Sequence, residues 1–203
     1  MKYIKKKIVV VHDRKDFGSS YAPFLANLGD VSNNTDNLEG IDLLVFTGGS
    51  DIDPSLYNHK KDKRTHSQPE RDAKEVEIFK RARALNIPML GICRGAQLLC
   101  VMAGGTLLQH IDGHSGNHNI DTKDGRSIIV NSGHHQMQQP PDNAVAVAWA
   151  NPPQSELGIK EYEVVYYPEI KALGIQFHPE ALPSQSTGSN YALALIQSYL
   201  WGR

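Results

Sequence analysis

Hydrophobic positions in the first half of the chain alternate between short continuous apolar runs and segments with helical spacing. The apolar runs predict buried strands at residues 7–12, 42–46 and 88–92. Helical spacing predicts a short helix at residues 21–28 and a longer one up to Leu85, opened by a capping box at residues 67–70. Strands that alternate with helices indicate a parallel sheet covered on both faces.

The second half is richer in strand patterns. Strands are predicted at residues 127–131, 144–150, 162–167 and 172–177, with a turn at 168–171 and a closing helix at 191–200. Long loops are expected at residues 30–40, 50–67 and 109–119, and such loops often carry function. The expected fold is therefore an α/β domain spanning residues 1–203, with a mostly parallel central sheet, helices on both faces and additional strands in the C-terminal half.

A cysteine lies where the strand at 88–92 turns directly into a helix. Cys93 has Gly91 two residues before it and Gly95 two residues after it. A strand-to-helix corner flanked by glycines is typical of a nucleophile elbow, and the start of the following helix stabilises negative charge on the side chain. The alternative is a small buried hydrophobic residue, an interpretation that suits Cys100 within the helix.

A nucleophilic cysteine needs a base and a group that orients the base. Of the nine histidines, His178 is the best candidate because it directly follows an apolar run, which places it at a strand end. Glu180 lies two residues further on, and Pro179 stiffens the segment between them, so both side chains can share one face. Taken alone, the pair also fits an exposed turn.

Two glycines follow the strand at 42–46 and form a third candidate element. Gly48 and Gly49 come directly after Thr47. Backbone without a Cβ can approach a reacting carbonyl closely, which suits an oxyanion hole, although a Gly-Gly pair also fits a simple turn.

Composition excludes several classes of partner. The net charge is -1, with 21 basic and 22 acidic residues, so we expect no nucleic-acid or membrane partner. We also expect no membrane span and no signal peptide. With two cysteines placed too far apart for a disulfide, reduced thiols and a cytoplasmic location are expected.

Taken together, the motifs resemble a known superfamily. Residues 47–49 (TGG), 91–97 (GICRGAQ) and 177–180 (FHPE) occur in the order found in class I glutamine amidotransferases. Residues 71–75, with Arg71, Asp72 and Glu75, and residues 130–136 (VNSGHHQ) resemble the γ-glutamyl hydrolase branch, which contains γ-glutamyl-γ-aminobutyrate hydrolase.

This resemblance implies a Cys-His-Glu triad that hydrolyses a γ-glutamyl amide through a thioester. Cys93 would attack the carbonyl carbon, His178 would transfer the proton and Glu180 would orient His178. The N–H groups of Gly49 and Arg94 would form the oxyanion hole. Substrate-binding roles are implied for Gly48, Gln97, His134, His135 and Gln136. No cofactor and no metal are expected, and the partner is a small γ-glutamyl molecule.

Other interpretations remain open at this stage. His110, His114 and His118 recur every four residues, a spacing that would stack three zinc ligands on a helix, but Gly113 and Gly116 favour a loop. A non-enzymatic binding module of the same architecture is a further alternative. An α/β-hydrolase is disfavoured because its acid precedes its histidine. Within the enzyme class, a glutaminase subunit that delivers ammonia to a separate synthetase is the alternative to a hydrolase, and the oligomeric state is undetermined.

Overall fold

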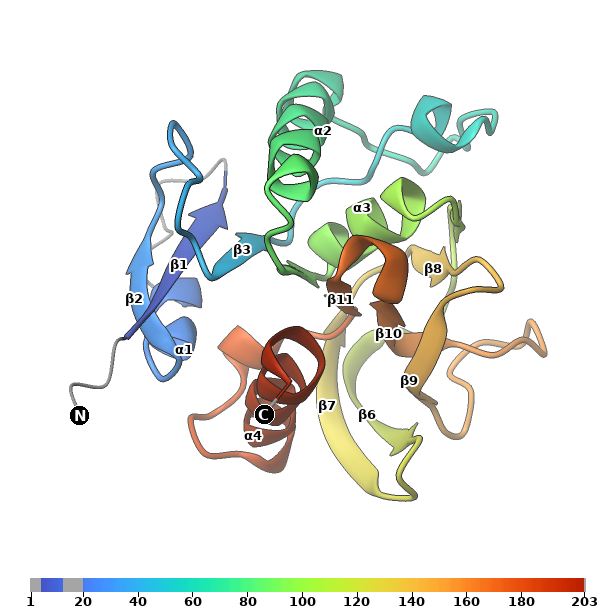
Figure 1. Ribbon diagram of the computed structural model, residues 1–203. Helices are drawn as coiled ribbons and strands as arrows, with labels where there is room; N and C mark the ends of the chain where they lie inside the picture. The colour runs from blue at the N-terminus through green and yellow to red at the C-terminus, as the bar shows by residue number, and fades with distance from the viewer. Residues whose placement is uncertain (1–4, 13–19, 203) are drawn as a thin grey trace.

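A mixed β-sheet organises the chain (Figure 1). The computed structural model describes residues 5–12 and 20–202. Within these residues the sheet has nine strands, whose bounds are β1 Lys6–Val11, β2 Gly29–Ser32, β3 Leu43–Phe46, β4 Met89–Ile92, β6 Ser115–Thr122, β7 Ser127–Gly133, β9 Val145–Ala150, β10 Tyr162–Tyr167 and β11 Ala172–Ile175. A separate pair is formed by β5 Thr106–Leu108 and β8 Met137–Gln139.

The strands follow the order β2-β1-β3-β4-β11-β10-β9-β6-β7. Strands β2, β1, β3, β4 and β11 pair in parallel, whereas every pair from β11 to β7 is antiparallel. The parallel part contains the three strands predicted from the first half of the sequence, together with β2 and with β11, which returns from the C-terminal half to pair with β4. The predicted fold class is confirmed.

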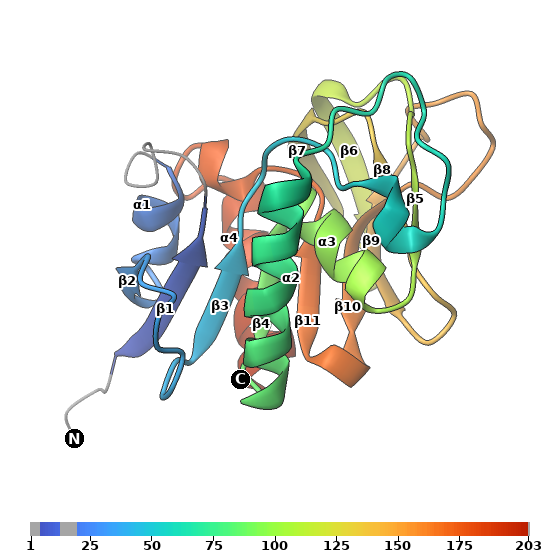
Figure 2. The same ribbon diagram turned by 90° about the horizontal axis from the view of Figure 1, so that it is seen from above.

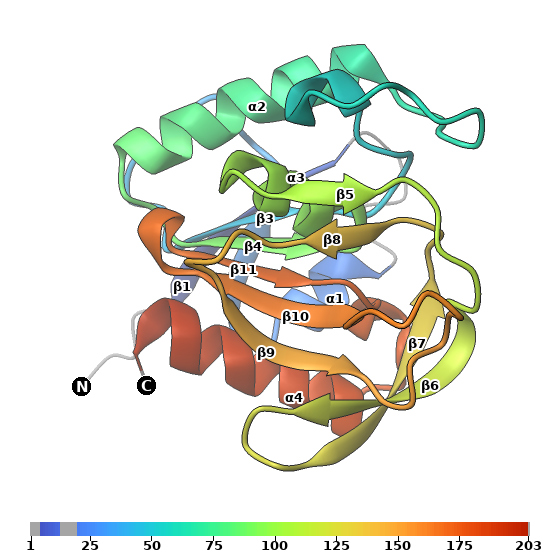
Figure 3. The ribbon, with the colours of Figure 1, turned by 90° about the vertical axis from the view of Figure 1, so that its right-hand side faces the viewer.

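Helices cover both faces of this sheet. They are α1 Tyr21–Leu25, α2 Pro69–Ala84, α3 Arg94–Met102 and α4 Thr187–Leu195, with single turns at Pro54–Tyr57, Pro168–Ile170, Pro179–Ala181 and Ile196–Leu200. Figures 2 and 3 show α2 and α3 on one face of the sheet and α1 and α4 on the other. None of the helices in the described residues is long and apolar enough to cross a membrane.

Each face of the sheet contributes to its own hydrophobic core. In β1, Ile8 and Val10 belong to the cluster on the side of α1 and α4, whereas Val9 and Val11 belong to the cluster with α2 and α3. Successive side chains of a strand point to opposite faces, so a strand buried on both sides needs a continuous apolar run. This requirement explains the apolar runs seen in the sequence.

The start of α2 differs from the sequence prediction. Gln68, not Ser67, precedes the first helical residue, and it makes no capping bond through its side chain. The Ser67 hydroxyl instead donates to Asp53 at 2.8 Å. The predicted capping box is therefore wrong, because the neighbouring loop offers Ser67 a carboxylate acceptor. Pro69 occupies the first turn as expected.

Several short or polar strands were not predicted. The expected loop at residues 109–119 contains the first half of β6, and the expected loop at 30–40 contains the end of β2. Strand β6 has the sequence SGNHNIDT, which lacks the apolar alternation of a strand. Its pairing with β7 over seven residue pairs, and not its local pattern, determines its structure.

Candidate active site

Three predicted segments meet at one edge of the sheet. Residues 47–49 follow β3, Cys93 follows β4, and His178 lies shortly after β11. These strands are adjacent and parallel in the order β3-β4-β11. Carboxyl ends of parallel strands lie at the same edge, which is where α/β sheets place their binding sites.

Cys93 occupies a sharp corner between β4 and α3. Its backbone has φ 53° and ψ −107°, a region that costs a non-glycine residue roughly 1–3 kcal/mol. A Cβ at Gly91 would lie 2.3 Å from the carbonyl oxygen of Gly95, and a Cβ at Gly95 would lie 2.2 Å from that of Phe46. Both glycines are needed for the helix to start so close to the strands, as the elbow interpretation expects.

His178 lies beside Cys93 and is held from two sides. Its Nδ1 lies 2.7 Å from Glu180 Oε1, and its backbone N–H donates to Asn131 Oδ1 at 3.1 Å. Burial opposes the charged imidazolium, but the hydrogen bond with Cys93 and the interaction with Glu180 outweigh it and raise the pKa of His178 to about 10. The geometry therefore favours an imidazolium that can give a proton to a leaving group.

The turn after β3 is fixed from behind by Arg71. The Arg71 guanidinium donates to the carbonyl oxygen of Gly48 at 3.1 Å, and a Cβ at Gly49 would lie 2.1 Å from Arg71 Nη1. Gly49 has φ +150° and leaves no room for a side chain. The N–H of Gly48 is directed to the Tyr21 hydroxyl at 3.0 Å, so the N–H of Gly49 is the remaining candidate of this turn for an oxyanion.

A buried ionic network supports the residue that follows Cys93. Arg94 is 1% exposed, and its guanidinium pairs with Asp72 and Glu75 of α2. Glu75 also accepts from Arg71 Nε at 2.7 Å. The network thus connects α2 both to the start of α3 and to the turn at Gly48 and Gly49, the two segments that supply the predicted oxyanion donors.

Neutralising Glu75 is expected to destabilise the fold. Glu75→Gln removes the carboxylate shared by two buried guanidinium groups, so we expect a loss of about 3 kcal/mol or more in the free energy of unfolding. Urea denaturation measures this loss. The matched control is Glu77→Gln on the exposed face of the same helix, which should change stability by less than about 0.5 kcal/mol. Equal effects of the two substitutions would contradict the role of the network.

Two of the predicted substrate-binding residues, Gln97 and Gln136, are joined by a hydrogen bond next to the start of α3. Gln97 is buried, and its amide donates to the carbonyl oxygen of Gln136 at 3.1 Å. The Gln136 side chain donates to Thr65 Oγ1 and to the Gln109 carbonyl, both at 3.2 Å. The side chains of Gln97 and Gln136 thus hold the segment in place, which leaves its backbone as the part that can contact a ligand.

The two histidines of that segment point in different directions. His135 Nε2 lies 3.1 Å from Asp51 Oδ1, on the loop after β3. The His134 side chain is 2% exposed and points into a buried cluster that contains Glu163. The backbone of this segment contacts α3 through the Gln136 carbonyl oxygen, which accepts from Gln97. The His134 side chain instead points toward Glu163, away from Cys93.

Sequence reasoning missed Tyr21 and Asn131. Burial and then the nearby charge of Glu180 raise the pKa of the Tyr21 phenol, and its oxygen accepts from Gly48. Asn131 fixes the backbone of His178. No local signal identifies Tyr21, whereas Asn131 lies in the motif at residues 130–136, which by itself gives this residue no role.

Cys100 contrasts with Cys93. Its side chain is fully buried, burial raises the pKa of its thiol to about 12, and its sulfur lies 3.5 Å from the carbonyl oxygen of Thr106. Both cysteines are free. Cys100 is therefore a packing residue, as the sequence suggested.

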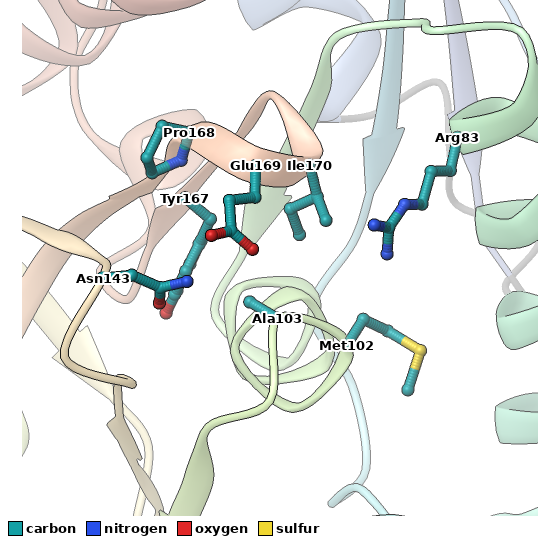
Figure 4. Close-up of a pocket in the computed structure, with 8 residues that line it drawn as sticks. All are labelled: Arg83, Met102, Ala103, Asn143, Tyr167, Pro168, Glu169 and Ile170. Atoms are coloured by element: carbon teal, nitrogen blue, oxygen red, sulfur yellow. The ribbon is translucent and has the colours of Figure 1, made fainter.

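A small pocket lies at the opposite ends of the strands. Figure 4 shows its lining residues, which are Arg83, Met102, Ala103, Asn143, Tyr167, Pro168, Glu169 and Ile170. It lies beside the end of α3 and before the start of β11, whereas Cys93 is at the start of α3 and His178 follows the end of β11. Its lining contains no cysteine, histidine or serine, so the pocket carries no part of the candidate chemistry.

Comparison with known proteins gives relatives that include putative glutamine amidotransferases and glutamine amidotransferase-like proteins. The "Putative glutamine amidotransferase-like protein YvdE" of Lactococcus lactis subsp. lactis is 31% identical over 175 residues, covering 74% of this chain and 71% of the relative. The "Putative glutamine amidotransferase Rv2859c" of Mycobacterium tuberculosis is 46% identical over 83 residues, covering 39% of this chain and 27% of the relative. The second match thus spans about a quarter of that longer protein.

Solved structures and a family description agree with these relatives. The structure of PurLQS from Thermotoga maritima matches with a TM-score of 0.69 at 17% identity, covering 96% of this chain and 98% of that chain, which supports the fold. The description of the Peptidase C26 family matches residues 18–127, more than half of the 203 residues. The chain belongs to the Peptidase C26 family of class I glutamine amidotransferase-like proteins.

Proposed function

We propose that this protein hydrolyses γ-glutamyl amide bonds through a thioester on Cys93. The observation that carries the proposal is the pairing of Cys93, at a strained strand-to-helix corner, with an imidazole whose far nitrogen lies 2.7 Å from Glu180. Nucleophile, base and orienting carboxylate are the three parts that covalent amide hydrolysis requires. Membership of a glutamine amidotransferase-like family supports the same chemistry.

The reaction would proceed in two steps. Cys93 Sγ attacks the γ-carbonyl carbon, and the oxygen becomes an oxyanion that accepts from the N–H groups of Gly49 and Arg94. His178 gives its proton to the departing nitrogen, the C–N bond breaks, and ammonia or an amine leaves. His178 then takes a proton from water, and the resulting hydroxide attacks the thioester carbon. The C–S bond breaks, the sulfur takes back its electron pair, and the γ-carboxylic acid that is released loses its proton to solvent.

Recognition is proposed to reside in the glutamyl half of the substrate. Gln97, one helical turn after Cys93, and Gln136 are buried and hydrogen-bonded, a fixed arrangement that suits strict recognition of one group. The leaving group would face the loops at 50–67 and 109–114, which carry exposed polar residues such as Lys60, Lys63 and Asp112. We therefore expect tolerance for the leaving group and strictness for the γ-glutamyl group.

An electrophilic glutamine analogue tests this proposal. It should label Cys93 and leave Cys100 unmodified, because the Cys100 thiol is fully buried and its pKa is raised to about 12. Mass spectrometry of the labelled protein identifies the site. Glutamine and γ-glutamyl-γ-aminobutyrate should both slow labelling, whereas an α-linked glutamyl dipeptide should not. Protection by the α-linked peptide alone would contradict the assignment of the γ-glutamyl group.

A glutaminase subunit is the second candidate. One of the two relatives is named as a putative glutamine amidotransferase and the other as a putative glutamine amidotransferase-like protein. Such enzymes transfer nitrogen from glutamine to an acceptor. In that case turnover of glutamine should be slow alone and should rise with a synthetase partner. Release assays with glutamine and several γ-glutamyl conjugates distinguish the two functions, because a free-standing hydrolase turns over conjugates without any partner.

A further inference from the structure

A second cluster of titratable side chains is buried between β6, β7 and β10. It contains His114 and His118 at the start of β6, His134 just after β7, and Glu161 and Glu163 at the start of β10. The side chains of His114, Glu161 and Glu163 are 0% exposed, and those of His118 and His134 are 4% and 2% exposed. The reaction proposed above uses none of these side chains.

Hydrogen bonds at the rim of the cluster fix the tautomers of two histidines. His134 Nδ1 lies 3.0 Å from the carbonyl oxygen of Gln136, which can only accept. His114 Nε2 lies 3.0 Å from Glu161, whose carboxylate already accepts from Gln154 and Ser155. Each ring therefore donates outward, and its other nitrogen, His114 Nδ1 or His134 Nε2, faces inward.

The inward atoms converge on Glu163. His114 Nδ1 lies 3.3 Å and His134 Nε2 lies 3.8 Å from Glu163 Oε1. Among the described residues, His114 Nδ1, His134 Nε2 and Glu163 Oε2 are buried and have no hydrogen-bond partner. The Glu163 carboxyl group thus faces both inward nitrogens.

We propose that His114, His134 and Glu163 bind a divalent cation of the zinc class. One donor atom from each of these residues lies within 4.8 Å of the other two. Ligands of a tetrahedral zinc ion, at about 2.0–2.1 Å from the metal, are separated by roughly 3.3 Å, so only a small contraction is required. Two imidazole nitrogens with one carboxylate form a donor set that suits zinc.

The surroundings match the outer partners of a metal site. A metal-bound histidine usually donates its other N–H to a carboxylate or a carbonyl oxygen, and here Glu161 and the Gln136 carbonyl occupy these positions. His118 Nε2 lies 3.1 Å from Glu163 Oε1 and either orients this carboxylate or supplies the fourth ligand. The helical set of His110, His114 and His118 is not formed, because His118 lies in β6, His114 directly precedes that strand and His110 pairs with Asp112.

The proposed ion would stabilise the segment behind the candidate active site. The Gln136 carbonyl oxygen accepts both from the His134 ring and from Gln97 on α3. A metal at His134 would thus connect β6 and β10 to the helix that begins after Cys93. Its expected effect is structural and does not depend on the proposed hydrolysis.

Zinc binding can be measured in the Cys93→Ala protein, which removes the active-site thiol as a competing ligand. After treatment with a chelator, calorimetric titration with zinc chloride should give one equivalent bound, and cobalt(II) should give the visible absorption of a four-coordinate site. Zinc should also raise Tm. Glu163→Gln and His134→Gln should each weaken binding by at least about 100-fold, and Glu161→Gln by about 10- to 100-fold.

The control is His110→Asn. It removes a histidine that pairs with Asp112 in the loop just before the cluster. This variant should bind zinc with the same affinity as the Cys93→Ala protein. Glu161→Gln keeps all three ligands, so it tests the site even where the ligand variants fail to fold. If the folded, metal-free Cys93→Ala protein binds no zinc at micromolar concentration, the proposal is overturned. The cluster is then a network of histidines and carboxylates that share protons. Binding that is lost in His110→Asn but retained in Glu161→Gln and Glu163→Gln would overturn it as well.

Discussion

Cys93→Ala is expected to reduce kcat by about 10,000-fold or more while the protein remains folded. The sulfur is the atom that would form the thioester, and no neighbouring group in the described structure can replace it at that corner. Alanine keeps the Cβ, so the strain of the backbone at φ 53° is the same in both proteins and stability should change little. Steady-state release of ammonia from glutamine, together with circular dichroism, measures both effects.

Cys100→Ala is the matched control, since it removes the same atom two helical turns away. Cys100 is fully buried in the core with α2 and α3, so its loss should cost about 1 kcal/mol of packing and leave kcat unchanged. Full activity in Cys93→Ala would refute covalent catalysis by this residue. Loss of activity in Cys100→Ala at unchanged stability would show that the wrong thiol was chosen.

His178→Asn should have the second-largest effect, a loss of about 1,000-fold or more in kcat. Asparagine keeps a similar size but cannot transfer a proton between sulfur, leaving nitrogen and water. The loss in kcat in Glu180→Gln should be roughly 10- to 100-fold smaller than that in His178→Asn. This substitution disturbs the orientation and charge of the His178 ring but leaves the imidazole in place. His59→Asn, at an exposed position on a loop, is the control and should have no effect.

The pH profile gives this prediction a second readout. His178 has its pKa raised to about 10, so the imidazolium persists at neutral pH and is lost as the pH rises through that value. Activity should therefore decline on the alkaline side with a midpoint near 10, and the stability gained from the imidazolium should fade between about 6.5 and 10. Glu180→Gln removes one cause of the raised pKa, so its alkaline limb should move to lower pH. An unmoved limb would contradict the assignment of His178 as the titrating acid.

Predictions from the sequence were best where one local pattern suffices. Apolar runs located β1, β3 and β4 within one or two residues, because strands buried on both faces admit few polar positions. The Gly91, Cys93 and Gly95 pattern located the corner, because only glycine lets backbone approach so closely on both sides. Gly49 and His178 lie shortly after such strands, so the same apolar runs predicted their position at the carboxyl edge of the sheet.

Predictions failed where a distant partner decides the structure. Strand β6 is polar and forms through pairing with β7, and Ser67 turns away from the helix start toward Asp53. Tyr21 reaches the candidate site because α1 packs beside the turn at Gly48, a contact over 27 positions of sequence. No window of the sequence contains both partners of such contacts.

The sequence by itself determined the alternation of elements, the strained corner and the order of Cys93, His178 and Glu180, because these follow from residue type and spacing along a few positions. Tertiary structure alone decided that Arg94 is anchored by Asp72 and Glu75, and that His134 turns inward to meet His114 and Glu163. Buried charges need partners of opposite charge or complementary hydrogen bonds, and those partners come from whichever strands and helices the fold brings together. The candidate triad could therefore be read from the sequence, whereas the ionic network and the buried histidine cluster became apparent only in the fold.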